Sequence, residues 1–250
     1  AKNPVAPAAA QKRTLALKRV VLDPGHGGKD PGAVGRGGLK EKHIVLDLAK
    51  MVKRELESRG GYEVILTRTT DKYLDLEERS VLANKRKADM FVSIHVNASR
   101  NKNLRGIETY VLDTTTEKSS QEVAERENMI TERRMHKSRD DVSFMLASLA
   151  LQDKSDKSAR LADKIHYSVV KTAQKRYKYV KDNHVRGAMF YVLYGAKMPS
   201  ALFEASYITN ASDAKLLKTR AYRKNLAKGV ADGIETYFRE ASRNQQIARK

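Results

Sequence analysis

The sequence contains no cysteine, no tryptophan and no long uninterrupted apolar segment. The absence of cysteine excludes disulfide bonds, cysteine-ligated zinc and a thiol nucleophile. Any metal ion would therefore have to be bound by His, Asp or Glu. No stretch approaches the length of a membrane span, and the first residues lack the apolar core of a signal peptide. We expect residues 1–17 to form a flexible lead-in or linker.

Acidic residues are scarce relative to basic ones, which leaves a net charge of +19. Such an excess is typical of proteins that work beside an anionic partner, and nucleic acid, an anionic membrane face and an anionic wall polymer all qualify. The alternative is a generally basic protein whose Lys and Arg side chains are simply solvated. The excess is uneven, because residues 215–250 carry ten basic and three acidic side chains.

A chain of 250 residues is long enough for one large α/β domain. Apolar runs that read as strands alternate with amphipathic segments that read as helices. Strands are predicted from residue 18 to the Asp-Pro at 23–24 and at 62–68, 89–95, 106–112, 189–193 and 200–204. Helices are predicted at 41–58, 75–87, 155–176, 211–217 and 220–240. This alternation predicts a single domain over residues 18–240, with a mainly parallel twisted sheet of about six strands flanked by helices.

Between residues 114 and 152 the alternation breaks, and we expect a helical insertion there. The segment mixes acidic and basic side chains and contains two amphipathic pieces, at about 120–135 and 141–151. Residues 241–250 are expected to form a basic tail. The insertion therefore stands apart from the repeating strand and helix pattern.

Two histidines follow or end predicted strands. His26 lies in a glycine-rich loop after the first strand, His95 ends a later one, and Glu41 begins the first helix. Because ligands bind at the carboxyl ends of strands in open α/β sheets, these side chains suggest a metal site built from His and Glu. Taken singly, each has an ordinary explanation, such as a helix-start Glu that complements the helix dipole. The loop alone could equally bind a phosphate.

Glu204 ends the last apolar strand. A carboxylate at the end of a buried strand is costly unless it has a partner, so it is a candidate proton carrier for a metal-dependent hydrolase. The alternative is an ordinary glutamate at a strand end.

The segment VLDPGHGGKDPGA at residues 21–33 resembles the opening motif of zinc-dependent N-acetylmuramoyl-L-alanine amidases of the cell-separation type. Further segments match later motifs of that family in order, and together they cover roughly residues 19–240. These are LKEK at 39–42, LTR at 66–68, SIHVNA at 93–98 and FEASYITN at 203–210. The sequence departs from the usual pattern at residues 205–207, where the family often has Gly or Ala before an aromatic residue.

The resemblance implies that His26, Glu41 and His95 bind Zn²⁺ and that Glu204 is the catalytic acid and base. It also implies cleavage of the amide between the muramic acid lactyl group and L-alanine in peptidoglycan. A periplasmic or otherwise exported location follows from the same resemblance.

Family members that act in cell division often carry an insertion whose helix blocks the active site. The segment AEREN at residues 124–128 resembles the corresponding element, which makes Glu127 the candidate blocking ligand, with Glu125 and Glu132 as alternatives. A protein activator would then withdraw the helix, and the apolar face of the second helix is a candidate contact for it. That face comprises Val142, Met145, Leu146 and Leu149. The alternative is a surface helical pair that packs on its own domain.

Two other functions fit parts of the sequence. A nucleic-acid binder would use the positive charge, but no helix-turn-helix or zinc-finger spacing is present, so we expect no nucleic-acid partner. A catalytically inactive wall-binding module would keep the fold without the chemical residues, all four of which are present. We expect a monomer, and we assign the other histidines to structure or surface. These are His43, His136, His166 and His184.

Overall fold

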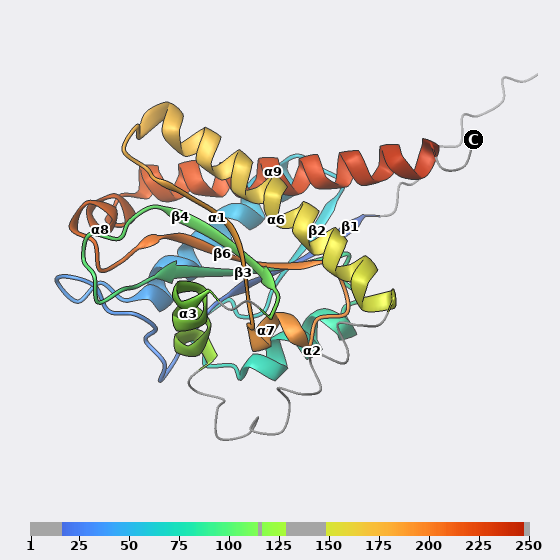
Figure 1. The fold of residues 1–250 in the computed structure, drawn as a ribbon. Helices are drawn as coiled ribbons and strands as arrows, with labels where there is room; N and C mark the ends of the chain where they lie inside the picture. Colours follow the sequence, from blue (N-terminus) through green and yellow to red (C-terminus); the bar gives the residue numbers. More distant parts are fainter. Residues whose placement is uncertain (1–16, 115–116, 129–148, 248–250) are drawn as a thin grey trace, which may run out of the picture.

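A computed structural model describes residues 17–114, 117–128 and 149–247 of the chain. Its centre is a six-stranded sheet in the order β2-β1-β3-β6-β4-β5 (Figure 1). The strands are β1 (Lys18–Pro24), β2 (Tyr62–Leu66), β3 (Met90–Asn97), β4 (Ile107–Leu112), β5 (Asp182–Ala188) and β6 (Ser200–Tyr207). All residues of β3 and β6 are buried, as the continuous apolar runs in these segments predict.

The sheet is mainly parallel, which confirms the predicted fold class. Strand β1 pairs in parallel with β2 and β3, β3 with β6, and β4 with β5. Only the pair β4 and β6 is antiparallel among the described strands. The carboxyl ends of β1, β3 and β6 therefore meet at one edge of the sheet, where ligands bind in folds of this type.

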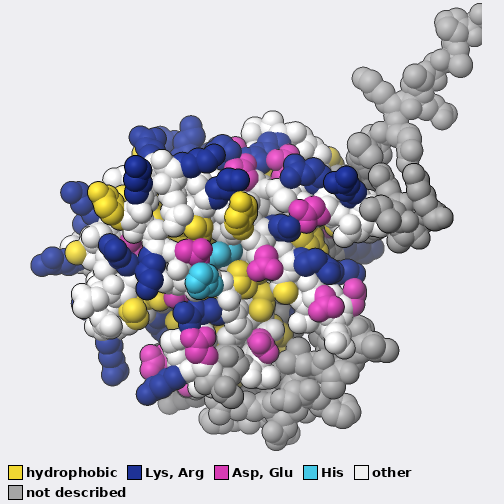
Figure 2. All heavy atoms as spheres, turned by 45° about the horizontal axis from the view of Figure 1, so that its top comes forward, with side chains coloured by type: hydrophobic (Ala, Val, Ile, Leu, Met, Phe, Trp, Pro, Cys, Tyr) yellow, Lys and Arg dark blue, Asp and Glu magenta, His cyan; other side chains and the backbone are white. Residues whose placement is uncertain are grey.

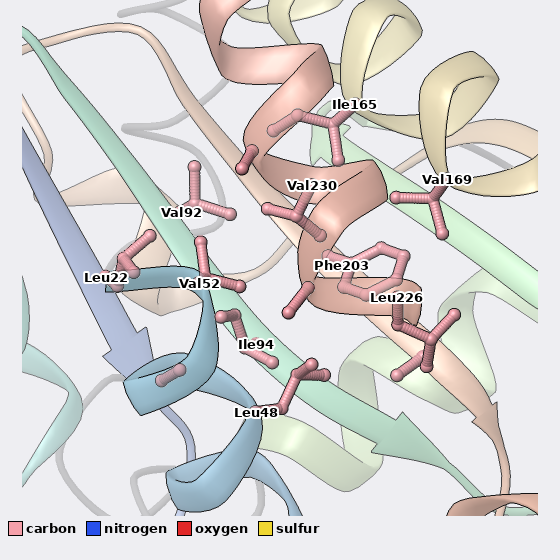
Figure 3. Packing of buried hydrophobic residues seen from close by; sticks show 14 of the residues in the cluster. Leu22, Leu48, Val52, Val92, Ile94, Ile165, Val169, Phe203, Leu226 and Val230 are labelled. Carbon is pink, nitrogen blue, oxygen red and sulfur yellow. The ribbon is translucent and has the colours of Figure 1, made fainter. Parts of the chain in front are cut away.

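Helices cover both faces of the sheet (Figure 1). The helices are α1 (Glu41–Ser58), α2 (Leu76–Lys85), α3 (Lys118–Asn128), α6 (Leu149–Arg176), α7 (Tyr191–Tyr194), α8 (Ala211–Lys218) and α9 (Arg220–Ile247). On one face, α1, α6 and α9 bury apolar side chains against the central strands (Figure 3). On the other face, α2, α3 and α7 pack on a smaller apolar cluster. No described helix is long and apolar enough to cross a membrane.

Two glycines bring α6 and α9 close together. A Cβ atom at Gly229 would lie 2.6 Å from the Cα of Val169, and one at Gly233 would lie 2.5 Å from the Cα of Ile165. Both distances are shorter than a Cβ contact allows, so a side chain at either position would push the helices apart. The branched side chains around them, including Val230, fill the layer between these helices and the sheet (Figure 3).

The predicted strand at residues 189–193 is wrong. Residues Tyr191–Tyr194 form the short helix α7, and the strand is instead the preceding segment Asp182–Ala188. A short apolar run fits a buried helical turn as well as a strand. The true strand was missed because β5 lies at the sheet edge, where only its last residue is buried and the rest of its side chains are polar or partly exposed.

Several helix boundaries also differ from those predicted. Helix α6 begins at Leu149 rather than at Ser155, and α9 continues to Ile247, through most of the segment expected to be a basic tail. The first insertion helix is present as α3, while residues 129–135 of that prediction lie outside the described residues. Most of the second predicted insertion helix, at 141–151, also lies outside them.

Candidate metal and catalytic site

Four side chains converge at the carboxyl edge of β1 and β3. His26 follows β1, Glu41 begins α1, His95 lies in β3 and Glu127 lies in α3. One ring nitrogen or carboxylate oxygen from each lies within 4.8 Å of the others. The structure thus brings together the three residues predicted to bind a metal and the residue predicted to block it.

The contacts within this cluster are short. Glu127 Oε2 lies 2.9 Å from His95 Nδ1 and 3.2 Å from His26 Nε2. The two oxygens of Glu41 each lie 3.2 Å from one of the same nitrogens. His26 Nε2, His95 Nδ1 and Glu127 Oε2 are buried without a hydrogen-bond partner among the described residues. Two imidazoles and two carboxylates facing one point are a ligand set that suits Zn²⁺.

The electrostatics of the cluster favour positive charge at its centre. Burial opposes protonation of His95, yet Glu127 and Glu41 raise its pKa to about 10. Burial likewise opposes protonation of His26, whose pKa Glu41, Asp30 and Glu127 raise well above its usual value. Burial raises the pKa of Glu41, but the neighbouring His26 and His95 outweigh this and lower it to about 2. A divalent cation at the centre would be stabilised by the same carboxylates that here stabilise the protonated imidazoles.

Neighbouring groups orient the candidate ligands. His26 Nδ1 lies 2.8 Å from an oxygen of Asp30, which leaves Nε2 facing the centre. The Glu41 oxygens accept hydrogen bonds from the backbone N–H groups of Ala33 and Val96, each at 2.8 Å. Partners of this kind set the ring orientation and the basicity of metal ligands. The sequence prediction missed Asp30, although its four-residue spacing from His26 within the loop was a usable signal.

Two glycines leave room for the candidate ligands. A Cβ at Gly25 would lie 2.3 Å from the ring of His95. At Gly32, where φ is +64°, a Cβ would lie 2.6 Å from His26 and 2.7 Å from Glu41. Only glycine fits at these two positions of the loop, because any side chain would displace a ligand.

Two buried arginines form hydrogen bonds with the backbone of the loop that carries His26. Arg68 donates to the carbonyls of Pro24 and Gly25, and Arg79 donates to the carbonyls of Pro24 and His26. Arg79 also forms a 2.9 Å ion pair with the fully buried Asp23. Burial raises the pKa of Asp23, but Arg79 and hydrogen bonds to the carboxylate bring it below its usual value. The position of His26 therefore depends on a charged network beneath it.

Glu204 lies beside the cluster. It is the register partner of His95 across the β3–β6 pair, and its side chain is completely buried. Neither of its carboxylate oxygens has a hydrogen-bond partner among the described residues. Burial, together with the Glu127 carboxylate, raises the pKa of Glu204 well above its usual value. A buried carboxyl group of this kind, next to a ligand cluster, is suited to accept and donate protons.

Helix α3 is attached to the rest of the site on both sides of Glu127. Arg126 donates hydrogen bonds to the carbonyl of Ala98, at 2.6 Å, and to Asn97 Oδ1, at 3.1 Å. Asn128 donates to the carbonyl of Met189 and accepts from the N–H of Tyr191. Three consecutive residues of α3 therefore contact the site or its surroundings, and Glu127 covers the other three residues of the cluster.

Of the two alternative blocking residues, one lies in the described part of the chain. Glu125 is exposed, and Glu132 lies outside the described residues. Of the other histidines, His43 and His184 are exposed, and His166 is buried between Thr109 and Asp182. These three positions agree with a structural or surface assignment. His136 lies outside the described residues.

The chain matches the model of the N-acetylmuramoyl-L-alanine amidase family (Amidase_3) over residues 20–236. It is 36% identical over 235 residues to N-acetylmuramoyl-L-alanine amidase AmiA of Escherichia coli, which covers 91% of this chain and 78% of AmiA. Among solved structures, an N-acetylmuramoyl-L-alanine amidase from Clostridium difficile 630 is 27% identical, with a TM-score of 0.69, covering 89% of this chain and 97% of that one. The CwlD amidase from Clostridioides difficile, solved in complex with the GerS lipoprotein, is 25% identical, with a TM-score of 0.67, covering 88% and 98%.

The chain therefore belongs to the N-acetylmuramoyl-L-alanine amidase family, and its reaction is hydrolysis of an amide in peptidoglycan. This confirms the family expected from the ordered motifs. All four side chains of the cluster lie within the matched residues.

Proposed function

We propose that this amidase is zinc-dependent, with His26, Glu41 and His95 as the metal ligands and the muramic acid–L-alanine amide as the bond cleaved. The observation that carries the proposal is the convergence of these side chains on one point within 4.8 Å, together with Glu127. Three protein ligands leave one position open for water or substrate, as catalytic zinc sites require.

In the proposed reaction, Glu204 carries the proton. When bound, Zn²⁺ supplies Lewis-acid polarisation of the amide carbonyl and lowers the pKa of water at the site. Glu204 accepts a proton as the water oxygen bonds to the carbonyl carbon, and it donates that proton to the departing nitrogen as the carbon–nitrogen bond breaks. The products are the lactyl carboxylate and the free amino group of L-alanine. The burial of Glu204 supports this role, because it raises the pKa of the carboxyl group above its usual value.

We further propose that the described arrangement is an inhibited state. Glu127 faces the same point as the three ligands and would take the position that a water molecule needs. Arg126 and Asn128 hold the helix in that place. Activity would then depend on the population of molecules in which α3 has moved away.

A protein activator is the proposed cause of that movement, acting in cell-wall remodelling and daughter-cell separation. The structure of the related CwlD amidase with the GerS lipoprotein supports the idea that this fold accommodates a protein partner. The predicted contact face at 142–149 lies outside the residues whose side chains are described. We propose a periplasmic location and a monomeric enzyme that acts on peptidoglycan, with no nucleic-acid partner.

Metal content and product release test the zinc assignment together. We expect about one zinc ion per chain in the wild type, little in His26→Ala, and a normal content in the control His43→Ala. Stem-peptide release from purified peptidoglycan should be lost wherever zinc is lost. Absence of zinc from the folded wild type after loading would contradict the proposal, as would hydrolysis by zinc-free His26→Ala.

A further inference from the structure

Two long segments of the chain contain no acidic residue. Residues 164–181 lie between Asp163 and Asp182, and residues 214–231 lie between Asp213 and Asp232. They carry twelve of the basic residues, and nine of the twelve are lysines. These are Lys164, Lys171, Lys175, Arg176, Lys178, Lys181, Lys215, Lys218, Arg220, Arg223, Lys224 and Lys228. The catalytic chemistry uses none of them.

The fold places the two segments side by side. Helices α6 and α9 pack against each other in opposite directions, with Gly229 against Val169. Asn225 Nδ2 donates to the carbonyl of Thr172, which joins the middle of the two segments. The outer surface formed by residues 164–181 and 214–231 is called the basic face below. Lys and Arg side chains are numerous on the left side of Figure 2; in Figure 1 that side holds the end of α6, α8 and the start of α9, together with the loops before α1 and before β4.

Little of this charge is neutralised within the protein. Within the part of the chain that the structure describes, three of the twelve side chains form ion pairs with carboxylates. These pairs are Lys164–Glu240, Arg223–Asp47 and Lys228–Asp232. The other nine basic side chains form none there. The electrostatic field of the basic face is therefore directed outward, to solvent or to an anionic partner.

Two grooves run beside α9 and add further cations. One, of about 560 Å³, lies between α1 and α9 and is lined by Arg54, Arg220 and Lys224 among others. The other, of about 390 Å³, lies between α6 and α9, and its lining includes Lys171 and Arg239. The linings also include carboxylates, Glu55 in the first groove and Asp232 and Glu240 in the second, but basic side chains outnumber them in both grooves.

We propose that the basic face docks the enzyme on an anionic phospholipid bilayer. The cations are spread along two long helices rather than gathered around one site, and most are lysines, which act as flexible point charges without a fixed geometry. Tyr167 is 64% exposed and Tyr179 is 82% exposed on the same part of the chain. Exposed tyrosines beside basic residues are typical of surfaces that meet lipid headgroups. A broad face of this kind matches a charged plane better than a single polymer strand.

Docking through this face would leave the candidate metal and catalytic site accessible. The basic face lies on helices that cover one face of the sheet, whereas the ligand cluster lies at the carboxyl ends of the strands. The two meet near Lys218, whose Nζ lies 3.5 Å from the position of a Cβ on Gly37, in the loop before Glu41. The docked enzyme would therefore act on peptidoglycan close to the membrane. The identity of the membrane rests on the proposed periplasmic location, whereas the binding itself needs neither zinc nor turnover.

Vesicle co-sedimentation tests the proposal with the full chain. The probes are vesicles of phosphatidylcholine alone and vesicles with about one third phosphatidylglycerol, at low and at physiological salt. The test variant is Lys171→Glu/Lys175→Glu/Lys224→Glu. The matched control, Lys85→Glu/Arg86→Glu/Lys197→Glu, changes the net charge equally at exposed positions around α2 and α7. Urea unfolding establishes that each protein is folded, and Lys→Gln replacements at the three test positions serve if the Glu variant is not.

Wild type and control should bind the anionic vesicles and not the neutral ones, and the test variant should bind at least about 30-fold more weakly. Failure of the wild type to bind anionic vesicles would overturn the proposal. An equal loss in test and control variants would also overturn it, because net charge alone would then explain the binding. Loss of binding to isolated peptidoglycan, with vesicle binding unchanged, would assign the face to the wall polymer instead. All these outcomes are independent of the zinc and stem-peptide assays that test the proposed function.

Discussion

A guanidinium nitrogen of Arg126 lies 3.7 Å from Oε1 of Glu204, while the next residue of α3, Glu127, contacts both histidines of the ligand cluster. Two adjacent residues of opposite charge thus cover two different parts of the site. Glu127 faces the proposed metal ligands, and Arg126 faces the proposed proton carrier. Each of these two side chains of α3 therefore lies beside a group of complementary charge, Glu127 beside the histidines and Arg126 beside Glu204.

Removing the Arg126 side chain should raise basal activity. Arg126→Ala deletes the hydrogen bonds to Ala98 and Asn97 and the charge next to Glu204. Because hydrogen bonds of charged groups contribute roughly 1.5–3 kcal/mol each, the open population should rise by about 10-fold or more. Stem-peptide release at equal zinc content measures the effect, with the exposed Glu125→Ala as control. Lower or unchanged release by the folded Arg126→Ala enzyme would contradict this role for the side chain.

Replacing Glu204 by glutamine should abolish hydrolysis without removing zinc. The amide side chain keeps the shape of the buried carboxyl group but cannot carry the proton, so turnover should fall by at least about 100-fold. Stem-peptide release and elemental analysis give the two readouts. Glu108→Gln, a change in another buried glutamate directly across the β4–β6 pair, tests whether loss of any buried carboxylate has the same effect. Near-normal turnover by Glu204→Gln would remove Glu204 from the mechanism.

Asp30 should determine how tightly zinc is held. Asp30→Asn weakens the contact to Nδ1 of His26 and should lower zinc affinity by about 10–100-fold, as for other partners of metal-bound histidines. Competition with a chelator of known affinity measures the change. Asp71→Asn, a change at an exposed carboxylate that accepts from Gly28 in the same loop, is the control. Equal zinc affinity in Asp30→Asn and wild type would show that the contact does not orient the ligand.

The Asp23–Arg79 pair should make stability depend on acid pH. The folded-state pKa of Asp23 lies below its unfolded value of about 3.9, so its contribution is present above about pH 4 and is lost as the pH falls through the folded-state value. Breaking a buried pair costs about 3–5 kcal/mol, so Asp23→Asn should lower the free energy of unfolding by about that much at neutral pH. The difference from wild type should shrink in acid.

Urea unfolding of wild type and Asp23→Asn, measured from neutral pH to about pH 3, gives this difference directly. The exposed Asp156→Asn is the control and should track the wild type throughout. A difference that stays constant over the whole range would mean that the charge of Asp23 does not stabilise the loop.

The central strands could be predicted from the sequence, and the edge strand β5 could not. Strands β3 and β6 are buried at every position, so their apolar runs carry a strong signal. Strand β5 has the sequence DNHVRGA and pairs with only one neighbouring strand. Because this sequence is mostly polar, it lacks the apolar run that predicts a strand. The apolar run after it packs as the helix α7 because tertiary contacts, and not local pattern, decide between the two forms.

The candidate site divides in the same way. His26, Glu41 and His95 could be found because strand ends and an ordered set of motifs marked them. Arg126 could not, since it lies in a polar helix and is far from Glu204 in the sequence. Only the tertiary fold brings the two side chains close together. Arg79 was missed for the same reason, because it reaches the loop of His26 from α2.

The measurement that tests the account most directly is stem-peptide release from purified peptidoglycan by zinc-loaded Glu127→Ala, compared with wild type and Glu125→Ala. Removing the carboxylate that faces His26 and His95 frees the fourth ligand position, so Glu127→Ala should release stem peptides at least about 10-fold faster than the other two proteins. His26→Ala in the same background should abolish the gain. Equal rates for all zinc-loaded proteins, or a slower rate for Glu127→Ala, would contradict both the inhibited state and the ligand geometry on which it depends.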